Sequence, residues 1–178
     1  MEPTTSDDRS QSARYVGVIG PGGEATPEEV STARQVGRLL AENYAILICG
    51  GHGGVMAAAC QGALELGGTT VGLLPGHDRS GANPYLTVAL PTGIGELRNG
   101  LVVKASDAVI AIGGSWGTLS EIALAMRTGK PIVVINGWAI EDPVHGRAKN
   151  LPHQAISAEQ AVDQALRLAS SGQESAEI

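Results

Sequence analysis

Short runs of apolar residues alternate along the chain with longer segments in which apolar positions recur every three or four residues. The short runs have the length of strands, and an unbroken apolar run is typical of a strand buried on both faces of a parallel sheet. The longer segments have the spacing of helices with one buried face. The predicted strands are residues 15–20, 45–49, 69–75, 85–90, 108–112 and 132–135, with a short last strand at 155–156.

This alternation predicts an α/β fold: a single-domain doubly wound, Rossmann-like parallel sheet with helices on both faces. Capping signals support the helices, since Thr26, Pro27 and Glu29 form a capping box with proline at the first helical position. Polar ends predict disordered tails at 1–13 and 172–178 around a domain at 14–171. The first predicted helix begins at residue 27, and the other predicted helices cover residues 55–66, 92–106, 119–128 and 161–170.

A glycine-rich turn joins the strand at 108–112 to the following helix. Its sequence is Gly113-Gly114-Ser115-Trp116-Gly117-Thr118. A helix that begins directly after such a turn leaves backbone N–H groups unpaired beside the positive end of its dipole, and these groups favour an anion such as phosphate. Thr118 and Glu121 also fit a Thr-x-x-Glu capping box. Glu121 therefore either closes the helix end, which is the commoner use of this spacing, or acts on a bound ligand.

Two further glycine turns follow strands in the same way. One is Gly20-Pro21-Gly22-Gly23-Glu24-Ala25, which matches G-x-G-x-x-A, and the other is Gly50-Gly51-His52-Gly53-Gly54. Because all three turns follow the carboxyl ends of parallel strands, we expect them to converge on one crevice. A dinucleotide-binding fold places an acidic residue at the end of the second strand, where Cys49 stands here, so the pattern disfavours NAD or NADP.

Charge and cysteine usage narrow the chemistry. The 178 residues carry a net charge of −6 without a run of Lys or Arg, which disfavours nucleic acid as a partner. The two cysteines lack CxxC spacing and the four histidines are scattered, so we expect no metal site. The polar start predicts no secretory signal, and no apolar run approaches the ~18 residues of a membrane span. We therefore expect a cytoplasmic protein without a membrane partner.

Two of the turns resemble motifs of the Lonely Guy family, long mislabelled lysine decarboxylase. Residues 50–56 are similar to its GGxxGxM turn, and residues 113–121 to its PGGxGTxxE motif, with Ile112 in place of the proline. The resemblance extends over about residues 15–135 and implies a homodimer. It also implies hydrolysis of the N-glycosidic bond of cytokinin nucleoside 5′-monophosphates to free base and ribose 5-phosphate, with Arg98 and Glu121 as the catalytic pair. A carboxylate can stabilise the oxocarbenium character that develops on the ribose.

Around Arg98 the chain is more similar to a sister branch. The Arg-Lys pair of Lonely Guy enzymes reads Arg98-Asn99, and the histidine two positions before the arginine reads Glu96. The Gly-x-x-Arg-Asn pattern, followed by Leu-Val-Val-x-x-Ser-Asp-Ala-Val-Ile-Ala-Ile-Gly-Gly, resembles the molybdenum cofactor carrier proteins. These proteins bind a phosphate-bearing pterin cofactor and protect it without chemistry.

The prediction is therefore a protein that binds a phosphate-bearing, nucleotide-like ligand as a molybdenum cofactor carrier-like protein, with no cofactor of its own. The alternative is a Lonely Guy-type phosphoribohydrolase. Trp116 could stack on a base or pterin ring or lie at a subunit interface. His52 could contact a ligand, although a histidine in a loop is more often only solvated, and Glu96 is expected to be a surface charge. The predicted ligand-binding residues are Gly20, Gly22, Gly50, Gly51, Gly53, Met56, Arg98, Asn99, Gly113, Gly114, Ser115, Trp116, Gly117 and Thr118.

Overall fold

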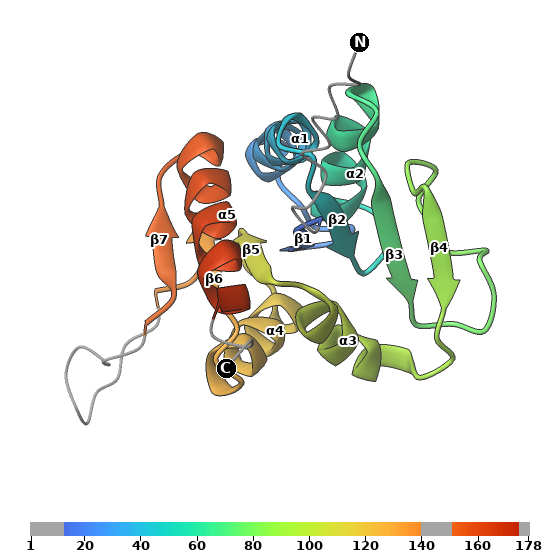
Figure 1. Cartoon of the computed structure of the whole chain (residues 1–178). Helices are drawn as coiled ribbons and strands as arrows, with labels where there is room; N and C mark the ends of the chain where they lie inside the picture. Colours follow the sequence, from blue (N-terminus) through green and yellow to red (C-terminus); the bar gives the residue numbers. More distant parts are fainter. Residues whose placement is uncertain (1–12, 140–150, 175–178) are drawn as a thin grey trace, which may run out of the picture.

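A single seven-stranded sheet forms the centre of the molecule. The computed structural model of the chain describes residues 13–139 and 151–174, with side chains as far as residue 170; the tail predictions for residues 1–12 and 175–178 lie outside them. Every strand pairs in parallel, in the order β4-β3-β2-β1-β5-β6-β7 (Figure 1). The strands are β1 Tyr15–Ile19, β2 Ile46–Cys49, β3 Thr70–Leu74, β4 Val88–Pro91, β5 Ala108–Ile112, β6 Ile132–Ile135 and β7 His153–Ala155.

Helices cover both faces of this sheet. One apolar cluster joins the sheet to α1, α2 and α5, and a second joins its other face to α3 and α4. This arrangement confirms the predicted α/β, doubly wound Rossmann-like fold. The helices are α1 Pro27–Glu42, α2 Val55–Glu65, α3 Arg98–Ala105, α4 Trp116–Arg127 and α5 Ala158–Glu174, and the 3₁₀ turn η1 Gly95–Leu97 precedes α3.

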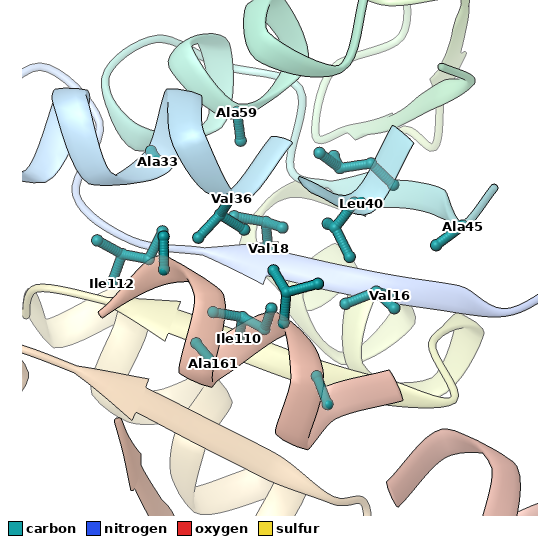
Figure 2. Close-up of a cluster of buried hydrophobic side chains, with 14 of the residues drawn as sticks. Val16, Val18, Ala33, Val36, Leu40, Ala45, Ala59, Ile110, Ile112 and Ala161 are labelled. Carbon is teal, nitrogen blue, oxygen red and sulfur yellow. The ribbon is translucent and has the colours of Figure 1, made fainter. Parts of the chain in front are cut away.

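Aliphatic side chains of the central strands β1 and β5 fill the space between the sheet and the helices α1 and α5. Val16 and Val18 of β1 and Ile110 and Ile112 of β5 lie beneath α1 and α5, fully buried (Figure 2). The apolar runs that predicted these strands are therefore the residues that hold the helices on the sheet, because each buried aliphatic side chain contributes roughly 1.5–3 kcal/mol of transfer free energy.

Helices α1 and α2 pack unusually close together through two glycines. A Cβ atom added at Gly37 of α1 would lie 1.9 Å from the carbonyl oxygen of Ala59, and one added at Gly62 of α2 would lie 1.9 Å from the carbonyl oxygen of Arg34. Both distances are far inside van der Waals contact. The helix pair, which carries the first two glycine turns at its amino ends, therefore depends on the absence of side chains at these two positions.

Some element boundaries differ from the prediction. β4 begins at Val88, later than the predicted residue 85, because the backbone at Tyr85 hydrogen-bonds to side chains and not to a neighbouring strand. Thr70 donates its hydroxyl to the Tyr85 carbonyl, and Asn83 accepts from the Tyr85 N–H. α5 continues to Glu174, beyond the predicted end at 170. Within the described ranges no helix is both long and apolar enough to cross a membrane.

The sheet order places a crevice between β1 and β5. The chain leaves β1 toward β2 on one side and, much later, returns to pair β5 on the other side. Connections therefore diverge at the carboxyl ends of these two neighbouring strands, which is where ligands bind in open α/β sheets. The first and third glycine turns follow these two strand ends.

Candidate functional site

The turn after β5 leads straight into α4. Gly113 turns the chain with φ +67°, and Ser115 is extended and caps the helix. The Ser115 Oγ accepts the backbone N–H of Thr118 at 3.2 Å and lies 2.9 Å from the Thr118 hydroxyl. The predicted capping box of Thr118 and Glu121 is therefore wrong. The helix begins three residues before the predicted position because Ser115, not Thr118, has the backbone conformation of a cap.

This cap makes a modest, testable contribution to stability. We expect Ser115→Ala to lower the free energy of unfolding by about 1 kcal/mol, because the Thr118 N–H loses its side-chain acceptor. Ser120→Ala is the matched control, since this exposed serine of the same helix donates only to the Gly117 carbonyl, which other donors can satisfy. Urea denaturation measures both. Equal losses in the two variants would contradict the assignment of Ser115 as the cap.

Glu121 does not cap the helix, and it lies in the second turn of α4. Only 7% of its surface is exposed, and among the described residues no hydrogen bond or ion pair reaches its carboxyl group. Burial raises the pKa of Glu121 from 4.5 to about 8; Arg98 opposes this increase, and Glu96 adds to it. Its carboxyl group is therefore mostly protonated at neutral pH, and it can donate a proton or a hydrogen bond to a bound molecule.

Arg98 is the buried cation of this region. It is the first residue of α3, directly after η1, and only 6% of its surface is exposed. One terminal nitrogen, Nη1, donates to the Asn99 side chain, but Nε is buried without a hydrogen-bond partner. A buried guanidinium N–H without a partner is costly, so Arg98 has hydrogen-bonding capacity that the described residues do not use.

Gly50 at the end of β2 gives the guanidinium its space. A Cβ at position 50 would lie 2.8 Å from both Cζ and Nη1 of Arg98. We expect Gly50→Ala to fold, because the far end of the Arg98 side chain can shift to make room. The shift moves the guanidinium, and we expect it to weaken binding of a phosphate-bearing ligand about tenfold. Gly76→Ala adds its methyl group to open space and serves as the control. Calorimetric titration measures both, and unchanged affinity in Gly50→Ala would contradict this role.

The three glycine turns are fastened to one another. At Gly54, with φ +60° and ψ −130°, a Cβ would lie 1.8 Å from the Gly22 carbonyl oxygen, and Val55 donates its N–H to the Pro21 carbonyl. Only glycine allows this approach. A Cβ at Gly20 would in turn meet the Ile112 carbonyl oxygen at 2.6 Å. Turns from three separate parts of the chain thus meet at one edge of the sheet.

These turns and the start of α3 enclose a pocket of about 320 Å³. It combines the amino end of α4, the Arg98 guanidinium and the protonated Glu121, a set suited to holding an anion and supplying a proton. Among the described residues that line it, Arg98 is the only Arg or Lys. The pocket is lined by Ile19, Gly20, Gly22, Gly23, His52, Met56, Glu96, Arg98, Asn99, Ser115, Gly117, Thr118 and Glu121.

The structure brings most of the predicted site residues together here, and it places others beside the pocket. Gly50 supports Arg98, and Gly113 is packed against the Glu29 side chain of α1. The predicted residues that do not line the pocket are Gly50, Gly51, Gly53, Gly113, Gly114 and Trp116.

His52 and Glu96 also line the pocket. Contact with a ligand was the less favoured of the two interpretations of His52, and Glu96 was expected to be only a surface charge. Their positions offered a signal, since His52 lies inside a glycine turn and Glu96 lies two residues before Arg98.

Trp116 forms an aromatic pair outside the pocket lining. Its ring meets that of Trp138 edge to face, with centroids 4.7 Å apart, and 78% of its surface is exposed. Gly114 makes room for this pair, because a Cβ there would lie 2.2 Å from the Trp138 ring. Trp116 follows Ser115, which does line the pocket, so an aromatic surface borders the site.

Comparison with known proteins matches this arrangement to one family. The model of the SLOG cluster4 family matches residues 13–170. An uncharacterized protein of Archaeoglobus fulgidus is 42% identical over 131 residues, which are 70% of this chain and 85% of that protein.

Two further relatives have described activities. The solved structure of the molybdenum cofactor binding protein of Rippkaea orientalis has a TM-score of 0.78 at 35% identity, covering 86% of this chain and 96% of that chain. The cytokinin riboside 5′-monophosphate phosphoribohydrolase of Mycobacterium tuberculosis is 31% identical over 120 residues, 62% of this chain and 64% of that protein.

Proposed function

The chain belongs to the SLOG cluster4 family, a Lonely Guy-like group of Rossmann-type proteins, and from this premise we propose that its pocket binds a phosphate-bearing, nucleotide-like ligand. The observation that carries the proposal is Arg98, a buried guanidinium whose Nε has no partner and which lines the pocket. A phosphate placed here would accept from Arg98 and from the free N–H groups at the start of α4.

Carriage of the molybdenum cofactor is the function we propose for this ligand site. The Rippkaea orientalis protein is similar over nearly its whole length, whereas the phosphoribohydrolase is similar over 64% of its length. Backbone N–H groups at the start of α4 add contacts to the anion.

One observation favours the second candidate, a phosphoribohydrolase. Glu121 faces the same pocket as Arg98 and is protonated near neutral pH, which is the state a general acid needs to assist a leaving base. In that role Arg98 would hold the sugar phosphate while the ionised form of Glu121 stabilises positive charge on the ribose. The two candidates share the ligand's phosphate and differ in whether a bond is broken.

Two assays run in parallel separate the carrier from the phosphoribohydrolase. The purified protein and its isosteric variant Glu121→Gln are incubated with AMP, GMP, CMP and a cytokinin nucleoside monophosphate, and free base is followed by chromatography. In parallel, the melting temperature is measured with and without molybdenum cofactor. The carrier proposal predicts no free base and a raised melting temperature. Base release by the wild type that disappears in Glu121→Gln would instead establish the hydrolase.

We further propose that two copies associate beside the site. Leu97 at the end of η1 and Leu101 of α3 expose 80% and 41% of their surfaces, next to Arg98. Exposed apolar side chains that gather in this way are typical of subunit contacts. We expect a homodimer by sedimentation velocity and a shift to monomer in Leu97→Glu. A wild-type protein that sediments as a monomer would contradict this part of the proposal.

A further inference from the structure

His52 occupies the middle of the second glycine turn and lines the pocket together with Gly22, Gly23 and Met56. Gly22, Gly23 and Met56 can offer a ligand only backbone groups or an apolar surface. Among the residues at this end of the pocket, beside the second glycine turn, His52 is therefore the one whose side chain can make a directional polar contact.

A distant loop fixes the position of His52. Asn83 is buried and donates its side-chain amide to the carbonyls of Gly51 and His52, at 3.2 and 3.1 Å. The Asn83 backbone N–H also donates to the Gly51 carbonyl, at 2.9 Å. The loop that contains Gly81 is thereby fastened to the second glycine turn, although about 30 residues separate them in the sequence.

The same loop fixes the tautomer of the imidazole ring. His52 Nδ1 lies 3.2 Å from the carbonyl oxygen of Gly81, and a carbonyl oxygen can only accept a hydrogen bond. Nδ1 must therefore carry the hydrogen, which leaves Nε2 of the neutral ring as an acceptor. Among the described residues, none hydrogen-bonds to Nε2, and it is not a buried atom lacking a partner, so this nitrogen is open.

We propose that His52 presents Nε2 to the pocket as a hydrogen-bond acceptor and selects ligands that carry an N–H or O–H donor at that end. The inference rests on the proposed binding of a phosphate-bearing ligand. In a nucleotide-like ligand the donor is either an amino group of the heterocycle or the ribose 2′-hydroxyl, and both have the chemistry that an imidazole acceptor recognises. A ligand lacking the donor leaves Nε2 desolvated without a partner and binds more weakly.

Three nucleotides and two variants test this role. AMP carries both donors, 2′-deoxy-AMP lacks one ribose hydroxyl, and purine riboside 5′-monophosphate lacks the amino group. His52→Asn keeps a donor near the position of Nδ1 for the Gly81 carbonyl but has no atom at the position of Nε2. His52→Gln reaches the position of Nε2 with an amide oxygen. Dissociation constants are measured by calorimetric titration for each nucleotide and protein.

We expect the wild type to bind AMP about tenfold more tightly than one of the other two nucleotides, which identifies the donor. His52→Asn should lose this preference and His52→Gln should keep most of it. Equal affinities for all three nucleotides in the wild type, or an undiminished preference in His52→Asn, would overturn the inference while leaving phosphate binding intact. Failure of every 5′-monophosphate to bind would overturn this inference and the binding of nucleotide-like ligands on which it rests, while the melting temperature with molybdenum cofactor decides carriage separately.

Discussion

The wild-type protein is expected to lose stability as the pH rises from about 5 to 8, and Glu121→Gln is expected to abolish this pH dependence. In the folded protein Glu121 keeps its proton up to its pKa of about 8, whereas in the unfolded chain it ionises near 4.5. Between these values the folded state holds one more proton than the unfolded state. The free energy of unfolding therefore falls with rising pH, by up to about 1.4 kcal/mol per pH unit, and becomes level above the folded pKa.

Burial is the physical cause of this expectation. The carboxyl group lies in α4 with 7% of its surface exposed, Arg98 favours its ionised form, and Glu96 disfavours it. Urea denaturation at pH 5, 6, 7, 8 and 9 gives the slope for each protein. Glu42→Gln, at an exposed glutamate of α1, is the control and should follow the wild type. Parallel curves for the wild type and Glu121→Gln would contradict the account of this residue.

Gly37→Ala should destabilise the fold by about 3 kcal/mol, although the same change in an open helix is stabilising. Its new Cβ would lie 1.9 Å from the Ala59 carbonyl oxygen and 2.9 Å from the Ala63 backbone nitrogen. These are backbone atoms of α2, so no side chain can turn aside and the two helices must separate. Overpacking of this kind costs more than the better helix propensity of alanine contributes.

Gly100→Ala is the matched control, because Gly100 also lies within a helix, α3. Its added Cβ would meet only the Leu124 side chain at 3.5 Å, an ordinary contact. We expect this variant to gain up to about 1 kcal/mol. Thermal and urea unfolding compare the two variants. Stability losses of similar size would mean that the α1–α2 contact tolerates a methyl group, and the proposed dependence on these glycines would be wrong.

Much of the fold could be predicted because local patterns carry it. The run 108–112 is an unbroken apolar strand, and it forms β5 with every residue buried. The capping box of Thr26 and Glu29 predicted the start of α1, and both of its hydrogen bonds are present. Such signals depend on neighbouring residues and need no knowledge of the distant chain.

The start of α4 could not be predicted with the same certainty, because two overlapping patterns compete there. Ser115 and Thr118 have the same three-residue spacing as Thr118 and Glu121. Thr118 is buried and bonded to Ser115, and Glu121 lies buried in the helix near Arg98 rather than at its end. Tertiary contacts, not the local motif, decide which residue caps the helix.

The remaining details of the site depend on contacts between distant segments. The space that Gly50 leaves for Arg98 and the anchoring of His52 by Gly81 join residues far apart in the sequence. A one-dimensional pattern contains neither contact. It does contain the three glycine turns, and because parallel strands bring their carboxyl ends to one edge, the position of the pocket could be predicted. The contacts that hold Arg98 and His52 in place within it could not.

The central claim is that the pocket recognises phosphate, and the affinity of a nucleotide relative to its own nucleoside tests it most directly. Calorimetric titration compares AMP with adenosine in the wild type and in Arg98→Ala. We predict that the phosphate improves the affinity of the wild type roughly 10- to 100-fold, the range of hydrogen bonds to a charged group, and that most of this ratio disappears in Arg98→Ala. Equal affinities for AMP and adenosine, or the same ratio in both proteins, would contradict the account.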